Sequence, residues 1–252
     1  MREIFFLSDF GLADPYAAVV KAVMRQTAPG AVIHDLAHNL PPGDLRRASY
    51  ILYESVPYLP RQSVVLAVVD PGVGSSRRAV LVIGERLCYV APDNGLLTLA
   101  YLQDPPRKAY LLENPAYHLP RKSATFHGRD VFGPVAAHLA SGVEPARFGP
   151  EVPVAELVRL PIHLNFGNHG EVLTFDRFGN AITTLLATPA QIRGKKVRIR
   201  YHHIPVASHY AEVPVGSALA YVGSAGLLEV AIHLGNAQEQ LGLKQGDRVE
   251  LG

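Results

Sequence analysis

Six consecutive apolar residues, Val64–Val69, end abruptly at Asp70-Pro71-Gly72. An uninterrupted apolar run of this length predicts a strand that is buried on both faces, which is usual in a parallel sheet covered by helices. Ile4–Ser8 is a second strand of this kind. Helical periodicity appears over 15–27 and again over 42–58. Strands that alternate with helices predict an α/β domain with a mostly parallel sheet.

The other predicted elements divide the chain into two parts. Up to about residue 150 they continue the α/β pattern, at 31–36, 79–83, 87–90, 96–102, 109–112 and 131–141. After about residue 160 the pattern changes to short alternating segments separated by glycines, at 171–175, 181–185, 196–201, 218–222, 228–232 and 248–251. That spacing is typical of a small antiparallel sheet or barrel. The sequence therefore predicts an α/β domain over residues 1–155 and a smaller antiparallel β-barrel domain over 156–252.

Composition excludes several classes of protein. With 24 Lys and Arg against 22 Asp and Glu, the net charge is +2, which provides no dominant field for nucleic acid. The single cysteine, Cys88, excludes a disulfide framework and a cysteine-based zinc site. No stretch approaches the roughly 18 apolar residues that span a bilayer, and the N-terminus lacks the pattern of a signal peptide. We therefore expect a soluble, cytoplasmic protein that binds neither nucleic acid nor membranes.

Two aspartates directly follow predicted strands. Asp9 lies in Ser8-Asp9-Phe10-Gly11, and Asp70 follows the Val64–Val69 strand. In open α/β sheets, ligands bind beyond the carboxyl ends of the strands. A carboxylate at such a place suits the two hydroxyls of a ribose, or a water that must be held and polarised. The alternative is that each aspartate only forms a turn or caps a helix.

A glycine-rich loop, residues 71–78, follows Asp70 and ends in two arginines. It lacks the Walker ending and the full dinucleotide fingerprint, so it is not predicted to cradle phosphate. Arg77 lies seven residues after Asp70, and a tight loop would fold it back to pair with the carboxylate; the alternative is a solvated arginine. His127 opens a helical pattern, where it would act across a cleft as a hydrogen-bond partner or base, or serve only as a structural histidine.

The predicted barrel contains one polar and aromatic turn, Asp176-Arg177-Phe178-Gly179-Asn180. Its phenylalanine could stack on a base or sugar, and its aspartate and asparagine could bind polar groups. Taken on its own, the turn is typical of a hairpin. His34, Asp35 and His38 are a possible set of metal ligands. This set is disfavoured, because His34 and Asp35 are neighbours at a strand end, where successive side chains point to opposite faces. We therefore predict no metal site.

Five motifs occur in order along the chain with fitting gaps. They are Ser8-Asp9-Phe10-Gly11, Asp70-Pro71-Gly72-Val73-Gly74 with Arg77, Ala91-Pro92-Asp93-Asn94-Gly95-Leu96-Leu97, Phe126-His127-Gly128-Arg129-Asp130 and Asp176-Arg177-Phe178-Gly179-Asn180. Together they closely resemble the S-adenosylmethionine (SAM) hydroxide adenosyltransferase family, the adenosine-forming SAM hydrolases. The fluorinating and chlorinating enzymes that act on the same substrate are relatives of that family. The resemblance covers essentially the whole chain.

This resemblance implies a fold, an assembly and a reaction. It implies an N-terminal α/β domain and a C-terminal β-barrel domain in a homotrimer, with the substrate between the N-terminal domain of one subunit and the barrel of the next. It also implies that water or hydroxide attacks the ribose C5′ of SAM and releases adenosine and L-methionine. Neither a metal nor a cofactor takes part in that reaction.

The site residues that the resemblance implies fall into two groups. The catalytic residues, which match the family's water-activating group, are Asp70, Arg77 and His127. The substrate-binding residues are Asp9 for the ribose hydroxyls, Asp176 and Ser224 for the methionine amine and carboxylate, and Phe178 and Asn180 for adenine. Phe178 is expected to stack on the base and Asn180 to form a hydrogen bond with it.

Departures from the halogenating relatives favour hydrolysis. Those relatives carry Tyr where this chain has Asp70, Tyr-Ser where it has His127-Gly128, and an insertion in the region between Gly84 and Tyr89. A halide pocket needs neutral donors, and an anion beside Asp70 would be repelled. A SAM-dependent halogenase is the alternative within the same fold. An adenosine- or SAM-binding protein without turnover is the alternative from another class.

Overall fold

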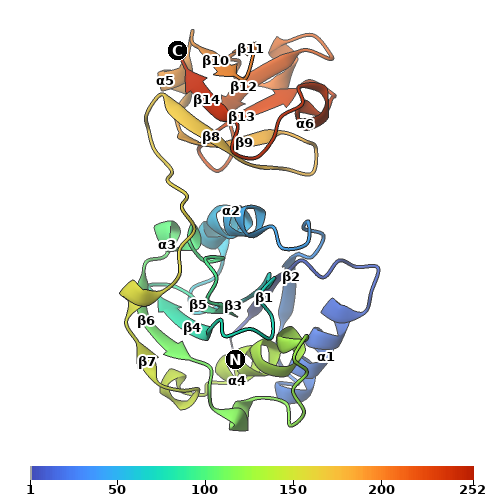
Figure 1. The fold of residues 1–252 in the computed structure, drawn as a ribbon, viewed down its shortest axis with the longest axis vertical. Coiled ribbons are helices and arrows are strands. Elements are labelled where there is room, and N and C mark those ends of the chain that lie inside the picture. Colours follow the sequence, from blue (N-terminus) through green and yellow to red (C-terminus); the bar gives the residue numbers. More distant parts are fainter. Residues whose placement is uncertain (1) are drawn as a thin grey trace. The chain divides into compact units, whose positions relative to one another are not determined.

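The computed structural model describes residues 2–252, which form two compact units (Figure 1). The first ends at Leu160, and the second is Pro161–Gly252. We call them the N-terminal unit and the barrel unit. The predicted domain boundary lies after residue 155, whereas the first compact unit ends at Leu160.

One seven-stranded sheet with the order β2-β1-β3-β5-β4-β6-β7 forms the centre of the N-terminal unit. Its strands are β1 (Ile4–Ser8), β2 (Ile33–Ala37), β3 (Val64–Val68), β4 (Ala79–Gly84), β5 (Cys88–Pro92), β6 (Pro106–Leu111) and β7 (Glu151–Val152). β2, β1, β3 and β5 pair in parallel, whereas β4 is antiparallel to β5 and to β6. Because β6 thus runs in the direction of the parallel strands, only β4 and β7 are reversed. The predicted mostly parallel sheet is confirmed.

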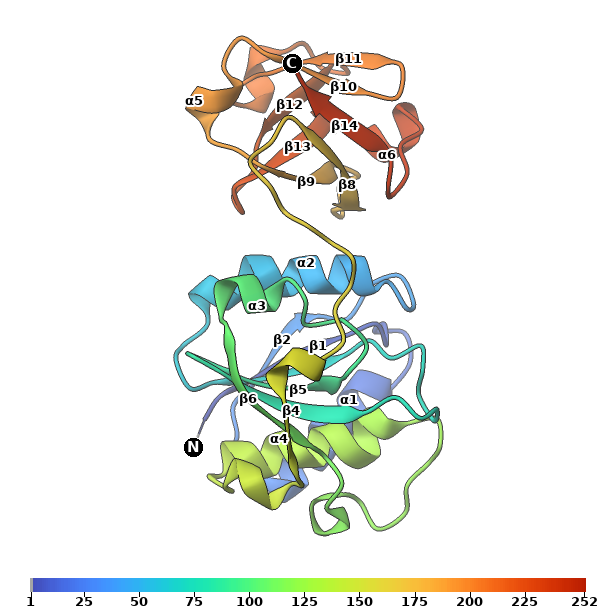
Figure 2. The same ribbon diagram turned by 60° about the vertical axis from the view of Figure 1, so that its left-hand side comes forward.

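Helices cover both faces of this sheet (Figures 1 and 2). α1 (Tyr16–Thr27) and α4 (Gly133–Ala140) pack on one face, and α2 (Leu45–Ser55) and α3 (Ala100–Gln103) pack on the other. The position of β3 between the two helical layers explains the unbroken apolar run of Val64–Val69. Alternate residues of this run belong to the two hydrophobic cores, and all six are buried. A strand with helices on both sides has no face left for polar side chains.

Two helices differ from the predicted ranges. α3 is shorter than the predicted 96–102, because the N–H of Leu99 donates to Oγ of Ser49 at 3.0 Å instead of continuing a helical ladder. The helix predicted over 131–141 begins earlier, as a π-helical turn over Gly128–Phe132 that leads directly into α4. Hydrophobic periodicity marks the buried face of a helix but does not specify where the ladder starts.

The barrel unit is a seven-stranded sheet with the order β11-β10-β14-β8-β9-β13-β12. Its elements are β8 (His169–Phe175), β9 (Ala181–Leu186), α5 (Pro189–Ile192), β10 (Lys196–Ile199), β11 (His202–Pro205), β12 (Ala218–Val222), β13 (Leu227–Ile232), α6 (Ala237–Gln240) and β14 (Arg248–Leu251). All neighbouring strands are antiparallel. The segment directly after β11 bonds the other edge strand, β12, where the N–H of Ala207 donates to the carbonyl of Ala220 at 2.9 Å. The sheet is therefore nearly closed, and the predicted antiparallel barrel is confirmed.

Two strands have no counterpart among the predicted elements. β7 is only two residues long, which is too short for periodicity to reveal. β11 places Ile204 in the core with 2% exposure, between the exposed His203 and Pro205. Its single inward residue and its histidines conceal the alternation of a strand.

Candidate active site

Asp9 and Asp70 emerge from adjacent parallel strands. Ser8, the last residue of β1, pairs with Val68, the last residue of β3, so both aspartates leave the same carboxyl edge of the sheet. The N–H of Gly43 donates to Oδ2 of Asp9 at 2.8 Å. The other oxygen, Oδ1, accepts no hydrogen bond within residues 2–252. Asp9 is therefore oriented by the backbone and keeps an acceptor for a ligand.

Arg77 joins Asp70 to His127. Its Nε donates to the two carboxylate oxygens of Asp70 at 2.9 and 3.0 Å, and its Nη2 also donates to Oδ2. The same Nη2 donates to Nδ1 of His127 at 2.9 Å. The side chains of Asp70 and Arg77 are only 6% and 11% exposed, and the guanidinium lies 5.1 Å from the ring centroid of Phe132. Of the two possibilities that the sequence left open, the structure contains the paired arginine.

The bond to Arg77 fixes the tautomer of His127. A guanidinium only donates, so Nδ1 accepts and carries no proton. Burial, followed by the positive charge of Arg77, lowers the pKa of His127 below its ordinary value, which keeps the ring neutral at pH 7. The ring proton is therefore on Nε2. Within this group, Nε2–H of His127 is thus available as a hydrogen-bond donor, and the carboxylate of Asp70 as an acceptor.

A cavity of about 280 Å³ lies beside Arg77 and His127 and is also lined by His118 and Lys122. Both ring nitrogens of His118 are buried without a hydrogen-bond partner within residues 2–252. Burial, followed by the positive charge of Lys122, lowers the pKa of His118 to about 4. A polar ring in a space of this size is suited to holding water.

Acidification is expected to destabilise the protein through His118. In an unfolded chain a histidine takes up its proton near pH 6.5, whereas the folded chain protonates His118 only near pH 4. The unfolded state binds more protons between these values, so the free energy of unfolding falls as the pH drops from 6.5 to 4. We expect about 1–2 kcal/mol from this half-buried ring, because solvent screens part of the effect. Thermal melts across this pH range measure the loss.

His118→Gln removes the titrating ring, so its melting temperature should fall less on acidification than that of the wild type. His203→Gln, at an exposed position of β11, is the matched control and should follow the wild type. Equal losses in the wild type and in His118→Gln would contradict the pKa assigned to His118.

Asp176 organises the turn between β8 and β9. Its Oδ1 accepts from the backbone N–H groups of Phe178 and Asn180, each at 2.8 Å. Its Oδ2 accepts from Nδ2 of Asn180, also at 2.8 Å. Phe178 is 73% exposed, whereas Asn180 is only 4% exposed. The turn therefore presents an open aromatic face beside a buried amide.

A chain of hydrogen bonds that the sequence analysis missed continues from this turn. Nδ2 of Asn180 donates to the hydroxyl of Tyr210 at 3.1 Å, and this hydroxyl is 2.8 Å from that of Tyr221. The hydroxyl of Tyr221 donates to Oε2 of Glu229 at 2.7 Å. These residues are distant in sequence and form no motif. One signal was available, since Glu229 interrupts the otherwise apolar strand Leu227–Ile232.

The predicted site residues are divided between the two units. The N-terminal unit contains Asp9, Asp70, Arg77 and His127. The barrel unit contains Asp176, Phe178, Asn180 and Ser224, the last of which is exposed in the turn between β12 and β13. Of the side chains considered for a metal, His34 pairs with Glu3, whereas His38 bonds Asp35 and Ser8. Within residues 2–252, no cluster of three or more His, Cys, Asp or Glu side chains could hold a metal ion.

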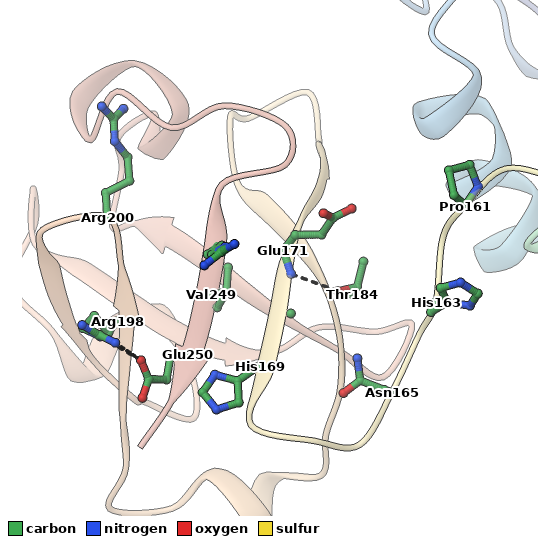
Figure 3. Close-up of a pocket in the computed structure, with 12 residues that line it drawn as sticks. Pro161, His163, Asn165, His169, Glu171, Thr184, Arg198, Arg200, Val249 and Glu250 are labelled. Atoms are coloured by element: carbon green, nitrogen blue, oxygen red, sulfur yellow. Dashed lines mark hydrogen bonds and ion pairs between the residues drawn. The ribbon is translucent and has the colours of Figure 1, made fainter.

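A cavity of about 800 Å³ on the barrel unit contains none of the predicted site residues (Figure 3). It is lined by charged side chains of both signs, among them Arg198, Arg248, Glu171 and Glu250. Arg198 is already paired with Glu250. The cavity is therefore separate from the candidate site.

Comparison with known families covers both units. The model of the SAM hydroxide adenosyltransferase N-terminal domain matches residues 4–149, and the model of the C-terminal domain matches residues 170–250. The chain belongs to the SAM hydroxide adenosyltransferase family. The family resemblance seen in the sequence is confirmed.

Relatives of the chain within and beyond this family are named for two activities. The (R)-S-adenosyl-L-methionine hydrolase of Thermus thermophilus is 59% identical over the full length of both chains. The hydrolase of the same name from Salinispora arenicola is 43% identical and covers 98% of this chain and 97% of its own length. A fluorinase from Nocardia brasiliensis is 25% identical, with 98% and 96% coverage.

Two solved structures share the fold of this member of the SAM hydroxide adenosyltransferase family. A conserved hypothetical protein from Thermus thermophilus superposes with a TM-score of 0.90 at 59% identity, with both chains fully covered. An uncharacterised conserved protein from Thermotoga maritima superposes with a TM-score of 0.89 at 34% identity, covering 99% of this chain and all of its own. No helix within residues 2–252 is long and apolar enough to span a bilayer.

The turn between β4 and β5 in this family member is short, since β4 ends at Gly84 and β5 begins at Cys88. Asp104, which is fully buried, accepts hydrogen bonds from the N–H of Arg86 at 2.8 Å, the N–H of Leu87 at 3.0 Å and the hydroxyl of Tyr89 at 2.9 Å. A buried carboxylate with three donors holds its turn in one conformation. The short turn is therefore a specified part of the fold.

Proposed function

We propose that this chain hydrolyses SAM to adenosine and L-methionine without a metal or cofactor. The observation that supports the proposal most strongly is Arg77, whose guanidinium bonds Asp70 and His127 at once. A pure binding module has no need for a buried carboxylate, guanidinium and imidazole connected in this way. Such a group is suited to holding and polarising one water molecule.

In the proposed reaction, a water lies between Asp70 and His127. It accepts a hydrogen bond from Nε2–H of His127 and donates one to the carboxylate of Asp70. A lone pair of the water oxygen forms the new bond to C5′, and the electron pair of the C5′–S bond leaves on sulfur. The sulfonium becomes a neutral thioether, so the leaving group needs no acid and no metal. The water proton passes to Asp70 and then to solvent.

Binding is assigned to the remaining predicted residues. Asp9, with its unpaired Oδ1, accepts hydrogen bonds from the ribose hydroxyls. Asp176 and Ser224 bind the amine and carboxylate of the methionine part. Phe178, with its ring exposed, stacks on adenine, while Asn180 forms a hydrogen bond with the base.

The second candidate function is a SAM-dependent halogenase, and the packing at Gly128 disfavours it. A Cβ added at Gly128 would lie 2.9 Å from Cζ of Phe10, closer than real Cβ atoms approach other side chains. The serine of the halogenating relatives at this position would therefore require Phe10 to move. Together with the carboxylate of Asp70, this packing favours water over a halide as the nucleophile.

The proposal is tested by incubating the purified protein with SAM, with and without chloride and with and without EDTA, and identifying the products by liquid chromatography and mass spectrometry. We expect adenosine and methionine, unchanged by either addition. A 5′-chloro-5′-deoxyadenosine product would establish the halogenase instead. Unconsumed SAM, with adenosine released when the protein is denatured, would establish a binding protein.

We further propose that the chain forms a homotrimer in which the N-terminal unit of one subunit and the barrel unit of its neighbour share a substrate. The two site groups lie in different units, and the family resemblance implies this assembly. Asp9→Ala and Asp176→Ala should each lose most activity, because the ribose or the methionine amine loses its acceptor. Mixing the two variants should restore part of the activity, since some mixed sites then carry both aspartates.

The mixing experiment is read by adenosine release, with trimers confirmed by light scattering. Subunits of one variant mixed with themselves are the control and should remain inactive. Mixed trimers that show no recovery would place the whole site within one subunit.

A further inference from the structure

The hydrogen-bond chain of the barrel unit has a defined direction. It begins at the carboxylate of Asp176 and ends at the carboxylate of Glu229, and an ionised carboxylate only accepts hydrogen bonds. Between them lie the amide of Asn180 and the hydroxyls of Tyr210 and Tyr221, at distances of 2.8, 3.1, 2.8 and 2.7 Å along the chain. The amide and the two hydroxyls must therefore be oriented so that a hydrogen points toward the carboxylate at each end.

The two ends together fix the amide of Asn180. Its Nδ2 faces Asp176, because a carboxylate cannot donate to an amide oxygen. The second hydrogen of Nδ2 goes to the hydroxyl of Tyr210. Both amide hydrogens are thus used inside the protein. The one polar atom left on this side chain is the carbonyl Oδ1, which makes no hydrogen bond within residues 2–252.

The tyrosines keep this arrangement because each has an acceptor for its own proton. Tyr210 accepts from Asn180 and passes its hydrogen to Tyr221, which passes its hydrogen to Glu229. Burial, followed by the hydrogen bonds to Tyr210 and Glu229, raises the pKa of Tyr221 far above its usual range, so Tyr221 remains a donor. Asn180 and Glu229 are only 4% and 7% exposed, so water does not compete strongly for these bonds.

We infer that Tyr210, Tyr221 and Glu229 are positioning residues that make Asn180 present only an acceptor to the purine base, so that the site selects a 6-amino purine over a 6-oxo purine. The inference rests on the proposed function, which places adenine beside this amide. The amino group of adenine donates a hydrogen bond to Oδ1. The oxygen of a 6-oxo purine would face Oδ1 as a second acceptor, with no hydrogen between them.

Tyr210→Phe is the decisive variant. It frees the second hydrogen of Nδ2, which can then donate to a 6-oxo group, while Asp176 still holds the amide in place. We expect the ratio of kcat/KM for SAM to that for its 6-oxo analogue, S-inosylmethionine, to fall by about tenfold or more. Calorimetric binding of adenosine and inosine to the full chain should show the same loss of preference. If Tyr210 had only a structural role, the substitution would lower kcat/KM equally for both substrates and leave the ratio unchanged.

Tyr221→Phe is the second variant, and it covers the case in which Tyr210→Phe does not fold. It deprives the Tyr210 hydroxyl of its acceptor and should lower the ratio by a smaller factor. Tyr201→Phe, at a position of the barrel unit that is 73% exposed, is the control and should leave the ratio unchanged. Folding of each variant is checked by circular dichroism and thermal melting.

The outcomes separate the two proposals. A wild type that hydrolyses SAM with a strong preference for the 6-amino purine, together with folded variants that keep that preference, would overturn the positioning role alone. A wild type that discriminates poorly between the two purines would overturn it as well. A wild type that neither hydrolyses SAM nor binds adenosine would overturn the proposed function, and the role of the tyrosines in purine selection would fall with it.

Discussion

Asp70→Asn is expected to abolish hydrolysis while leaving SAM bound. Asparagine has the size of aspartate, so it fills the same space and still accepts a hydrogen bond from Arg77. It carries no charge and cannot take the proton of the attacking water. Loss of a positioned general base typically lowers kcat by about 10²–10⁴-fold. The rate of adenosine release measures kcat, and calorimetry measures the dissociation constant for SAM, which should change by less than about threefold.

Asp14→Asn is the matched control for this substitution. Asp14 is exposed in the same unit and takes no part in the candidate site. The Asp14→Asn variant should therefore release adenosine at the wild-type rate. Full turnover by Asp70→Asn would remove Asp70 from the proposed mechanism. Loss of SAM binding in Asp70→Asn would instead assign the carboxylate a role in binding the substrate.

Arg77→Met is expected to have the largest effect on stability. Methionine retains much of the aliphatic length of arginine but leaves the carboxylate of Asp70, only 6% exposed, without its cation. Removing one partner of a buried ion pair typically lowers the free energy of unfolding by about 3–5 kcal/mol. Urea unfolding followed by circular dichroism measures this loss. Activity should also disappear, because neither Asp70 nor His127 is then held in place.

The double variant Asp70→Asn/Arg77→Met separates the two effects of Arg77. It removes the uncompensated charge, so most of the lost stability should return, whereas hydrolysis should not. A single Arg77→Met variant that is within about 1 kcal/mol of the wild type would show that the pair is solvated and contributes little. A double variant as unstable as the single one would assign the loss to packing on Phe132 instead of to charge.

Much of the fold could be predicted because its local signals agree with its tertiary structure. The run Val64–Val69 is apolar throughout since helices cover both faces of its strand, and the same reasoning applies to Ile4–Ser8. The ends of these strands locate Asp9 and Asp70 without further information. The short strands β7 and β11 and the early start of the helix near Gly128 depend on particular hydrogen bonds, which periodicity does not report.

The candidate site was predictable only in part. The spacing allowed Arg77 to pair with Asp70 but did not require it. Only the family resemblance assigned Arg77 to the site. The tyrosines that fix Asn180 could not be found in this way, because Tyr210 lies 30 residues from Asn180 and outside every strand. A hydrogen-bond network formed by tertiary contacts leaves no periodic trace in the sequence.

The loops that carry Arg77 and His127 touch each other at Gly74. This glycine has a φ of +81°, and a Cβ on it would lie 2.5 Å from the carbonyl oxygen of Ala124, so no other residue fits there without moving one loop. A change in the length of either loop would be transmitted to the other. We therefore expect that an evolving lineage can exchange the side chains at 70 and 127, and with them the nucleophile, far more readily than it can lengthen either loop. A new nucleophile would then be used by a fold whose two site loops keep their lengths.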